Sequence, residues 1–186
     1  MLRLADPGRF ILASIALGFL LMFAVVAYSA VEYSMLPDLV AVDFGPGGRP
    51  EIGPKEELLT PLAIVNGIGL GVVALISVMA IHRHKIVERY PYLINLPALT
   101  LILGRITDGK RKREYIDRIF VMLALVPLFV AAMLGVVVAS ILEAAKSMTF
   151  DGTFMMASIS VLVAALISAS LLYYRSIYKK IVAEFT

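Results

Sequence analysis

Four long stretches of the chain contain no charged side chain, and each is long enough to cross a bilayer as a helix. They cover about residues 10–31, 58–81, 119–142 and 152–174. The shortest would be roughly 33 Å long as an α-helix, and the hydrocarbon core of a bilayer is about 30 Å thick. The pattern predicts an all-α integral membrane protein, a single membrane domain with four transmembrane helices arranged as two hairpins.

Residues 32–57 form the first polar connection, which we interpret as a folded outer loop. It contains four prolines, and the alternation of side chains from Val40 to Phe44 indicates a short strand before a glycine-rich turn. Prolines restrict the unfolded chain and so lower the entropic cost of order. With the apolar Leu36 and Leu39, they favour a cap that covers the outer ends of the helices.

Residues 82–118 form the second connection and contain most of the basic charge. Its apolar part, residues 92–103, is too short to span a membrane and is interrupted by Pro97. Leucines at helical spacing favour an interfacial segment on the cytoplasmic face. A re-entrant loop that lines a pore, with Asn95 at its tip, is the alternative.

Lysine and arginine set the expected orientation. They concentrate at the N-terminus, in residues 82–118 and after residue 174, whereas the other two connections contain few. The positive-inside rule therefore predicts a multi-pass protein of the cell membrane with cytoplasmic N- and C-termini. The basic run Lys110, Arg111, Lys112 and Arg113 is expected to lie on anionic lipid headgroups, at roughly 1 kcal/mol per residue, rather than on nucleic acid.

Small residues at intervals of four predict close contacts between helices. Gly67 and Gly71 form one such ridge, residues 131, 135 and 139 a second, and residues 160, 164 and 168 a third. Pro127 lies inside the third apolar stretch and is expected to kink it and free a carbonyl one turn back.

Few residues suggest a binding site. Asp38, Asp43 and Glu51 could hold a hard cation, but their spacing fits no EF-hand, and a solvated acidic loop explains them more simply. Asn66 is the one amide within the apolar stretches, where it either serves a ligand or bonds across helices, and the second role fits its glycine neighbours.

Metal and catalytic chemistry have little support. His82 and His84 have no third ligand nearby, so we interpret them as part of a basic flank. The chain contains no cysteine, which excludes disulfides and thiol chemistry. No apolar stretch contains the ionisable residue that proton-coupled transport usually requires. We therefore expect no catalytic residue, no metal and no cofactor.

Two motifs resemble a membrane family. Leu36-Pro37, then Val40 to Gly45, then Gly48-x-Pro50-Glu51 and Lys55, are similar to a family defined as a domain of unknown function. The same domain forms the N-terminal part of SdpI-type toxin-immunity proteins. Tyr90-Pro91 followed by Asn95-x-Pro97 resembles an element after the family's second span. Asp43 stands where the family has a histidine.

The resemblance implies a small prokaryotic membrane protein, in some members tied to immunity or signalling. The expected function is accordingly a non-enzymatic immunity, signalling or partner-binding module, with a protein partner at the outer loop. A small carrier or channel, or an accessory subunit of a membrane complex, is the alternative. The sequence leaves a homo-oligomer open.

Overall fold

The computed structural model describes residues 6–45, 48–90 and 105–185. The expected interfacial segment at residues 92–103, with Asn95, lies outside the described residues. In chain order, the described elements are α1 (Pro7–Ser34), β1 (Leu39–Phe44), β2 (Pro50–Pro54), the short 3₁₀ helix η1 (Lys55–Leu58), α2 (Leu59–Ile81), α3 (Arg83–Arg89), α5 (Gly109–Ser147) and α6 (Gly152–Phe185).

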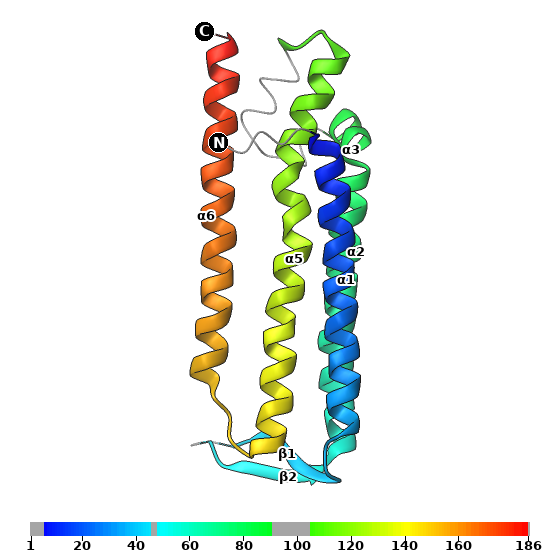
Figure 1. Ribbon diagram of the computed structural model, residues 1–186, viewed down its shortest axis with the longest axis vertical. Helices are drawn as coiled ribbons and strands as arrows, with labels where there is room; N and C mark the ends of the chain where they lie inside the picture. Colours follow the sequence, from blue (N-terminus) through cyan, green and yellow to red (C-terminus); the bar gives the residue numbers. More distant parts are fainter. Residues whose placement is uncertain (1–5, 46–47, 91–104, 186) are drawn as a thin grey trace.

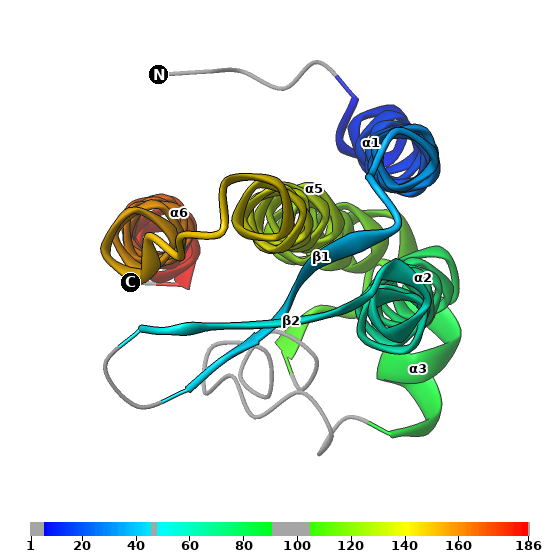
Figure 2. The ribbon, with the colours of Figure 1, turned by 90° about the horizontal axis from the view of Figure 1, so that it is seen from below.

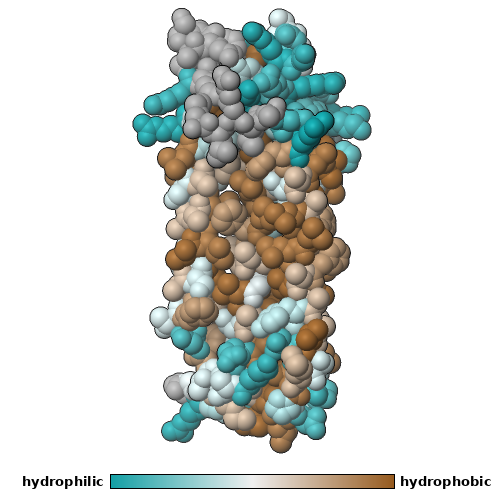
Figure 3. Space-filling model, viewed as in Figure 1, coloured by the Kyte–Doolittle hydropathy of each residue, from teal (hydrophilic) through white to brown (hydrophobic). Residues whose placement is uncertain are grey.

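Four of these helices are long and apolar enough to cross a membrane: α1, η1 with α2, α5, and α6 up to residue 179. Each expected span lies within one of them, which confirms a multi-pass, predominantly helical membrane protein. A broad apolar belt separates two more polar ends of the molecule (Figure 3). The β-hairpin lies at one end, and α3 and the start of α5 lie at the other (Figure 1).

The bundle is organised around α5. This helix packs against α1, α2 and α6, and it also contacts α3 and β1. Seen along the helix axes, α1 and α6 flank α5, and α2 lies beside α1 (Figure 2). Because α1 and α2 each pack more extensively on α5 than on one another, the packing does not by itself divide the helices into two hairpins.

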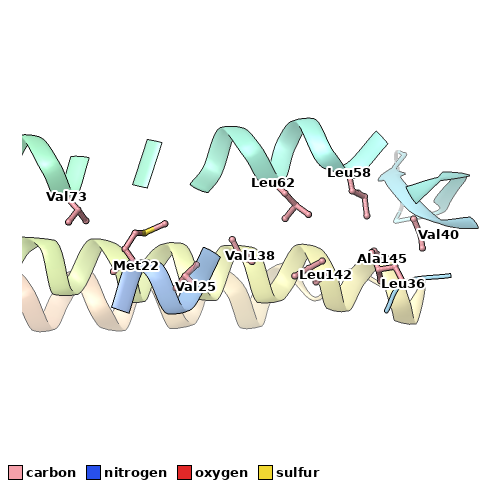
Figure 4. Packing of buried hydrophobic residues seen from close by; sticks show 11 residues of the cluster. Met22, Val25, Leu36, Val40, Leu58, Leu62, Val73, Val138, Leu142 and Ala145 are labelled. Carbon is pink, nitrogen blue, oxygen red and sulfur yellow. The ribbon is translucent and has the colours of Figure 1, made fainter. Parts of the chain in front are cut away.

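The core lies between α1, α2 and α5. Near the hairpin it contains Met22, Val25, Leu62, Val73 and Leu142, all buried and pointing into the space between these three helices (Figure 4). A second cluster toward the opposite end joins α1, the α2–α3 junction and α5; it comprises Ile11, Ile15, Ala80, Val87, Ile116, Phe120, Val121 and Ala124. By contrast, the most apolar stretch of α6 contains no fully buried residue.

Local sequence signals explain where the helices begin. Asp6 precedes α1, accepts hydrogen bonds from the backbone N–H groups of Gly8 and Arg9, and is followed by Pro7 at the first helical position. Asp108 accepts from the N–H of Lys110 in the same way and starts α5. Each carboxylate satisfies donors that a helix N-terminus leaves unpaired.

The expectation that Gly67 and Gly71 pack against another helix was wrong. A Cβ atom built on either glycine has no neighbour within 4 Å, so both lie on the exposed face of α2. The close approach occurs instead at Gly69, where a Cβ would lie 2.6 Å from Met22 Cε and from Leu134 Cδ1. Residues two positions apart on a helix point in nearly opposite directions. Because Gly69 faces α1 and α5, Gly67 and Gly71 face away from them.

The other two ridges differ from each other. Gly135 does meet α1, since a Cβ there would lie 3.2 Å from Val25 Cγ2. Ser160, Ala164 and Ser168 are exposed on α6 and make no ridge against another described helix. The closest backbone approach involves two residues that the ridges do not include: a Cβ on Gly18 would lie 2.7 Å from Pro127 Cβ.

Pro127 lies inside α5, which nevertheless runs as one helix from Gly109 to Ser147. Proline lacks the N–H that would bond the carbonyl of Leu123 one turn back. The side of α5 that contains Pro127 is buried against Gly18 of α1. Glycine leaves the room that the proline ring needs there.

Candidate functional site at the hairpin end

The β1–β2 hairpin gives the connection between α1 and α2 a defined shape, and the strand expected from Val40 to Phe44 is confirmed. β1 pairs antiparallel with β2, from Leu39 opposite Pro54 to Phe44 opposite Pro50. The register shifts between Ala41 and Asp43, which leaves Val42 as the extra residue of a β-bulge. Val42 lies over Gly53, where a Cβ would be 2.9 Å from Val42 Cγ2. A side chain at position 53 would therefore displace Val42.

Buried side chains fix the hairpin to the end of the bundle. Leu36, Val40 and Leu58 belong to the same buried cluster as Leu142 and Ala145 near the end of α5 (Figure 4). Burying a side chain of this size contributes roughly 1.5–3 kcal/mol. Three such contacts offset part of the entropic cost of holding the connection in one place.

Two further contacts hold the ends of the hairpin. Lys55 Nζ donates to the Leu36 carbonyl at 3.2 Å and lies 3.5 Å from Asp38 Oδ1. At the tip of β1, the Phe44 ring lies against the Phe150 ring of the α5–α6 connection, with centroids 5.7 Å apart. The hairpin, which is part of the α1–α2 connection, thus also contacts the α5–α6 connection at this end of the molecule.

The three acidic residues considered as a cation site are all on the hairpin but do not converge. Asp43 and Glu51 are paired across the strands and exposed, whereas Asp38 precedes β1 and lies beside Lys55. The Asp43 carboxylate accepts the N–H of Phe44 at 2.7 Å. Among the residues that the structure describes, no group of three or more His, Cys, Asp or Glu side chains could hold a metal.

Two apolar side chains of the hairpin are also exposed. Leu39 is 60% exposed and Ile52 is 49% exposed. Both lie outside the apolar belt of the four long helices, at the polar end of the molecule. The exposed part of the hairpin therefore includes both apolar and acidic side chains.

Asn66 bonds across two helices. Its Nδ2 donates to Ser29 Oγ of α1 at 3.2 Å, and its Oδ1 is buried without a hydrogen-bond partner. The contact joins α1 to α2 about two helical turns from the start of α2. The packing role fits this geometry, and the free acceptor is the part of Asn66 that a ligand or a water molecule would satisfy.

A second polar cluster lies at the opposite end of the bundle. Asp117 Oδ1 of α5 accepts from Arg83 Nε at 2.6 Å, and His84 Nε2 lies 3.0 Å from the same oxygen. Arg83 also donates to the Ala80 carbonyl at the end of α2 at 2.8 Å. Gly8, at the start of α1, lies beside Arg83 and Asp117. Three separate parts of the chain meet at this cluster.

His84 also belongs to this cluster. Its burial lowers its pKa, and the attraction of Asp117, which raises the pKa, is too weak to compensate because Arg83 and Arg113 oppose it. Its Nε2 lies beside the Asp117 carboxylate. Nδ1 is buried without a partner. His82 is exposed, so the two histidines share no site.

The basic run is on the first turn of α5 rather than in a loop. Lys110, Arg111 and Arg113 are exposed and Lys112 is half-buried. Sequence reasoning did not identify Asp117 as a partner for Arg83, nor the ion pair between Glu32 of α1 and Lys146 of α5 at the hairpin end. Both pairs join residues far apart in the sequence, and no local spacing indicates them.

Comparison with known proteins adds one relative. No protein-family model matches the chain, and no solved structure matches it. An uncharacterized protein of Archaeoglobus fulgidus is 32% identical over 130 residues, which is 69% of this chain and 67% of the archaeal protein. At that identity, over two thirds of both sequences, the chain belongs to the same family as this uncharacterized archaeal protein.

Proposed function

We propose that the chain is a non-enzymatic membrane module whose β-hairpin binds a protein partner outside the membrane. The observation that carries this proposal is the attachment of the hairpin, with Leu36, Val40 and Leu58 buried in the end of the bundle. A tether would leave these side chains in water. A fixed hairpin loses little further conformational entropy when a partner binds, which raises affinity.

The composition of the free face supports a protein partner. Leu39, Ile52, Asp43 and Glu51 are all exposed on the hairpin. Apolar anchors supply contact area, and the carboxylates favour a partner with a basic surface. Residues 36–55 resemble the domain-of-unknown-function family that also forms the N-terminal part of SdpI-type immunity proteins, and we extend the proposal to a role of this kind. In this proposal both termini are cytoplasmic and residues 35–58 face outward.

Site-specific photo-crosslinking tests the proposal in native membranes. A photoreactive residue at Ile52 should give a discrete protein adduct. The same residue at Ile64, which is 54% exposed on α2 within the apolar belt, should give only lipid adducts. Adding Leu39→Ser should remove the Ile52 adduct while the protein's melting temperature stays the same. Identical adducts at both positions, or none at Ile52, would refute the proposal.

A second candidate function, an accessory subunit of a membrane complex, is supported by α6. This helix packs chiefly along α5, and its Val161, Leu171 and Leu172 are 64–70% exposed. A photoreactive residue at Val161 distinguishes the two functions. A protein adduct there, without one at Ile52, would favour the accessory subunit.

A further inference from the structure

A groove of about 650 Å³ opens between α1, α5 and α6. We call it the α1–α5–α6 groove. Its α5 side includes Ala131, Gly135 and Ala139, whose small side chains leave space between the flanking helices. The volume lies in the range of roughly 300–1,000 Å³ typical of small-molecule sites. The small residues that sequence analysis assigned to helix packing therefore also form a cavity.

The polarity of the groove changes along its length. Leu21 and Val25 of α1 line the part toward the middle of the bundle. Tyr28, Glu143 and Asp151 line the part nearest the hairpin. A ligand that fills it must have an apolar portion within the apolar belt and a polar portion near the hairpin. That description fits an amphiphile lying parallel to the helices.

The charge at the polar end selects the headgroup. Glu143 and Asp151 both line the groove, and within the described residues neither carboxylate is in an ion pair. Lys146, one turn beyond Glu143, is held by Glu32 of α1. Both carboxylates are exposed, so water solvates them in the absence of a ligand. An anionic headgroup would be repelled there, whereas a cationic one would gain attraction that a neutral one lacks.

Aromatic rings lie at the same end. Tyr28 of α1 and Phe154 of α6 line the groove from its two flanks. Ammonium groups bind to the faces of aromatic rings, and carboxylates beside the rings add attraction. We propose that the α1–α5–α6 groove binds an amphiphile with an alkyl chain and an ammonium headgroup, taken from the surrounding membrane. This inference does not depend on the function proposed for the hairpin.

A second groove offers an internal comparison. It has a volume of about 550 Å³ and lies between α2, α5 and α6, with Met79, Phe120, Leu123, Ser170 and Tyr173 among its lining residues. It contains no carboxylate among the described residues that line it. Alkyl chains can occupy either groove, but only the α1–α5–α6 groove should distinguish a cation from a neutral headgroup.

Thermal melting in dodecyl maltoside, with octyltrimethylammonium, octanol and octanoate as probes, tests the proposal. Ligand binding to the folded state raises the melting temperature in a saturable manner, which gives an apparent Kd. Octyltrimethylammonium should stabilise the protein with the lowest apparent Kd. Glu143→Gln and Asp151→Asn should each raise that Kd by about two- to five-fold, as expected for partly solvated charge pairs. Asparagine at 151 still caps α6, whose Phe154 N–H bonds to Asp151 Oδ1.

Two matched variants locate the site. Ala139→Leu fills the α1–α5–α6 groove and should abolish the saturable shift, whereas Ser170→Leu fills the other groove and should leave it unchanged. Glu57→Gln removes an exposed hairpin carboxylate outside the groove and should also have no effect. Equal stabilisation by octanol, or equal behaviour of Ala139→Leu and Ser170→Leu, would overturn the proposal. If Ala139→Leu does not fold, the apparent Kd values of Glu143→Gln and Asp151→Asn are compared with that of Glu57→Gln. Equal Kd values in all three would overturn the proposal.

Discussion

Three glycine-to-alanine substitutions test how closely α5 is packed. At Gly18 the new Cβ would lie 2.7 Å from Pro127 Cβ and 3.4 Å from the Pro127 carbonyl carbon. At Gly69 it would meet Met22 and Leu134, whose contacting atoms are the ends of flexible side chains. At Gly71 it would meet nothing within 4 Å. We expect destabilisation in the order Gly18→Ala, then Gly69→Ala, with Gly71→Ala neutral or stabilising.

The magnitude follows from the difference between these sites. Alanine is favoured over glycine inside a helix by about 0.8–1.0 kcal/mol, and this gain is similar at all three positions. It therefore cancels when two variants are compared. Overpacking a tight contact costs about 1–3 kcal/mol, and the proline ring and helix backbone at Gly18 cannot rotate away. The free energies of unfolding of Gly18→Ala and Gly71→Ala should thus differ by about 1–3 kcal/mol.

Far-UV circular dichroism melts in dodecyl maltoside measure the effect, because the chain has neither cysteine for a thiol dye nor tryptophan for fluorescence. A difference of about 1–3 kcal/mol corresponds to about 2–12 °C for a protein of this size. Equal melting temperatures for Gly18→Ala and Gly71→Ala would refute the close packing of α1 on α5. A lower melting temperature for Gly71→Ala than for Gly18→Ala would show that the other face of α2 is the buried one.

Three further results are expected. Single cysteines at Arg49 and Lys110, exposed to an impermeant thiol reagent on intact cells, should be labelled at 49 and not at 110; the reverse would contradict the proposed orientation. The pKa of His84 is lowered from its ordinary value of 6.5 on folding, so the folded state binds the proton less well and stability should fall as pH drops below that value. His84→Gln should flatten this dependence of stability on pH. An unchanged slope would show that His84 does not cause it. Ser29→Ala should lower the free energy of unfolding by about 0.6 kcal/mol through the lost bond to Asn66, and denaturant titration would show no loss if Asn66 bonded elsewhere.

The helices and the hairpin strand could be predicted from the sequence because their signals are local. An uncharged run of more than twenty residues has one stable form in lipid, since every backbone polar group must bond within the segment. Alternation from Val40 to Phe44 and glycine at 48, where φ is +76°, similarly act over a few residues. Such features do not depend on which helix packs against which.

The contacts between helices could not be predicted in the same way. Gly67 and Gly71 have the spacing of a contact ridge, but helix spacing alone does not say which side of α2 faces α5. The pairing of Gly18 with Pro127 and of Arg83 with Asp117 joins residues on separate helices, far apart in the sequence. A proline on one helix and a glycine on another become complementary only once their depths and directions are known.

Charged pairs hold α5 to its neighbours at both ends of the bundle. Glu32 of α1 pairs with Lys146 at the hairpin end, and at the other end Asp117 binds Arg83 of α3 beside Gly8. Sliding of α1 along α5 would break the first pair and displacement of α3 from α5 would break the second, so ion pairs link α1, α3 and α5 into one unit. No charged pair in the described residues joins α6 to that unit. The groove between α2, α5 and α6 is lined by several residues of α6, whereas the α1–α5–α6 groove meets α6 at Phe154 in its first turn. A shift of α6 against α5 would therefore chiefly change the width of the groove between α2, α5 and α6.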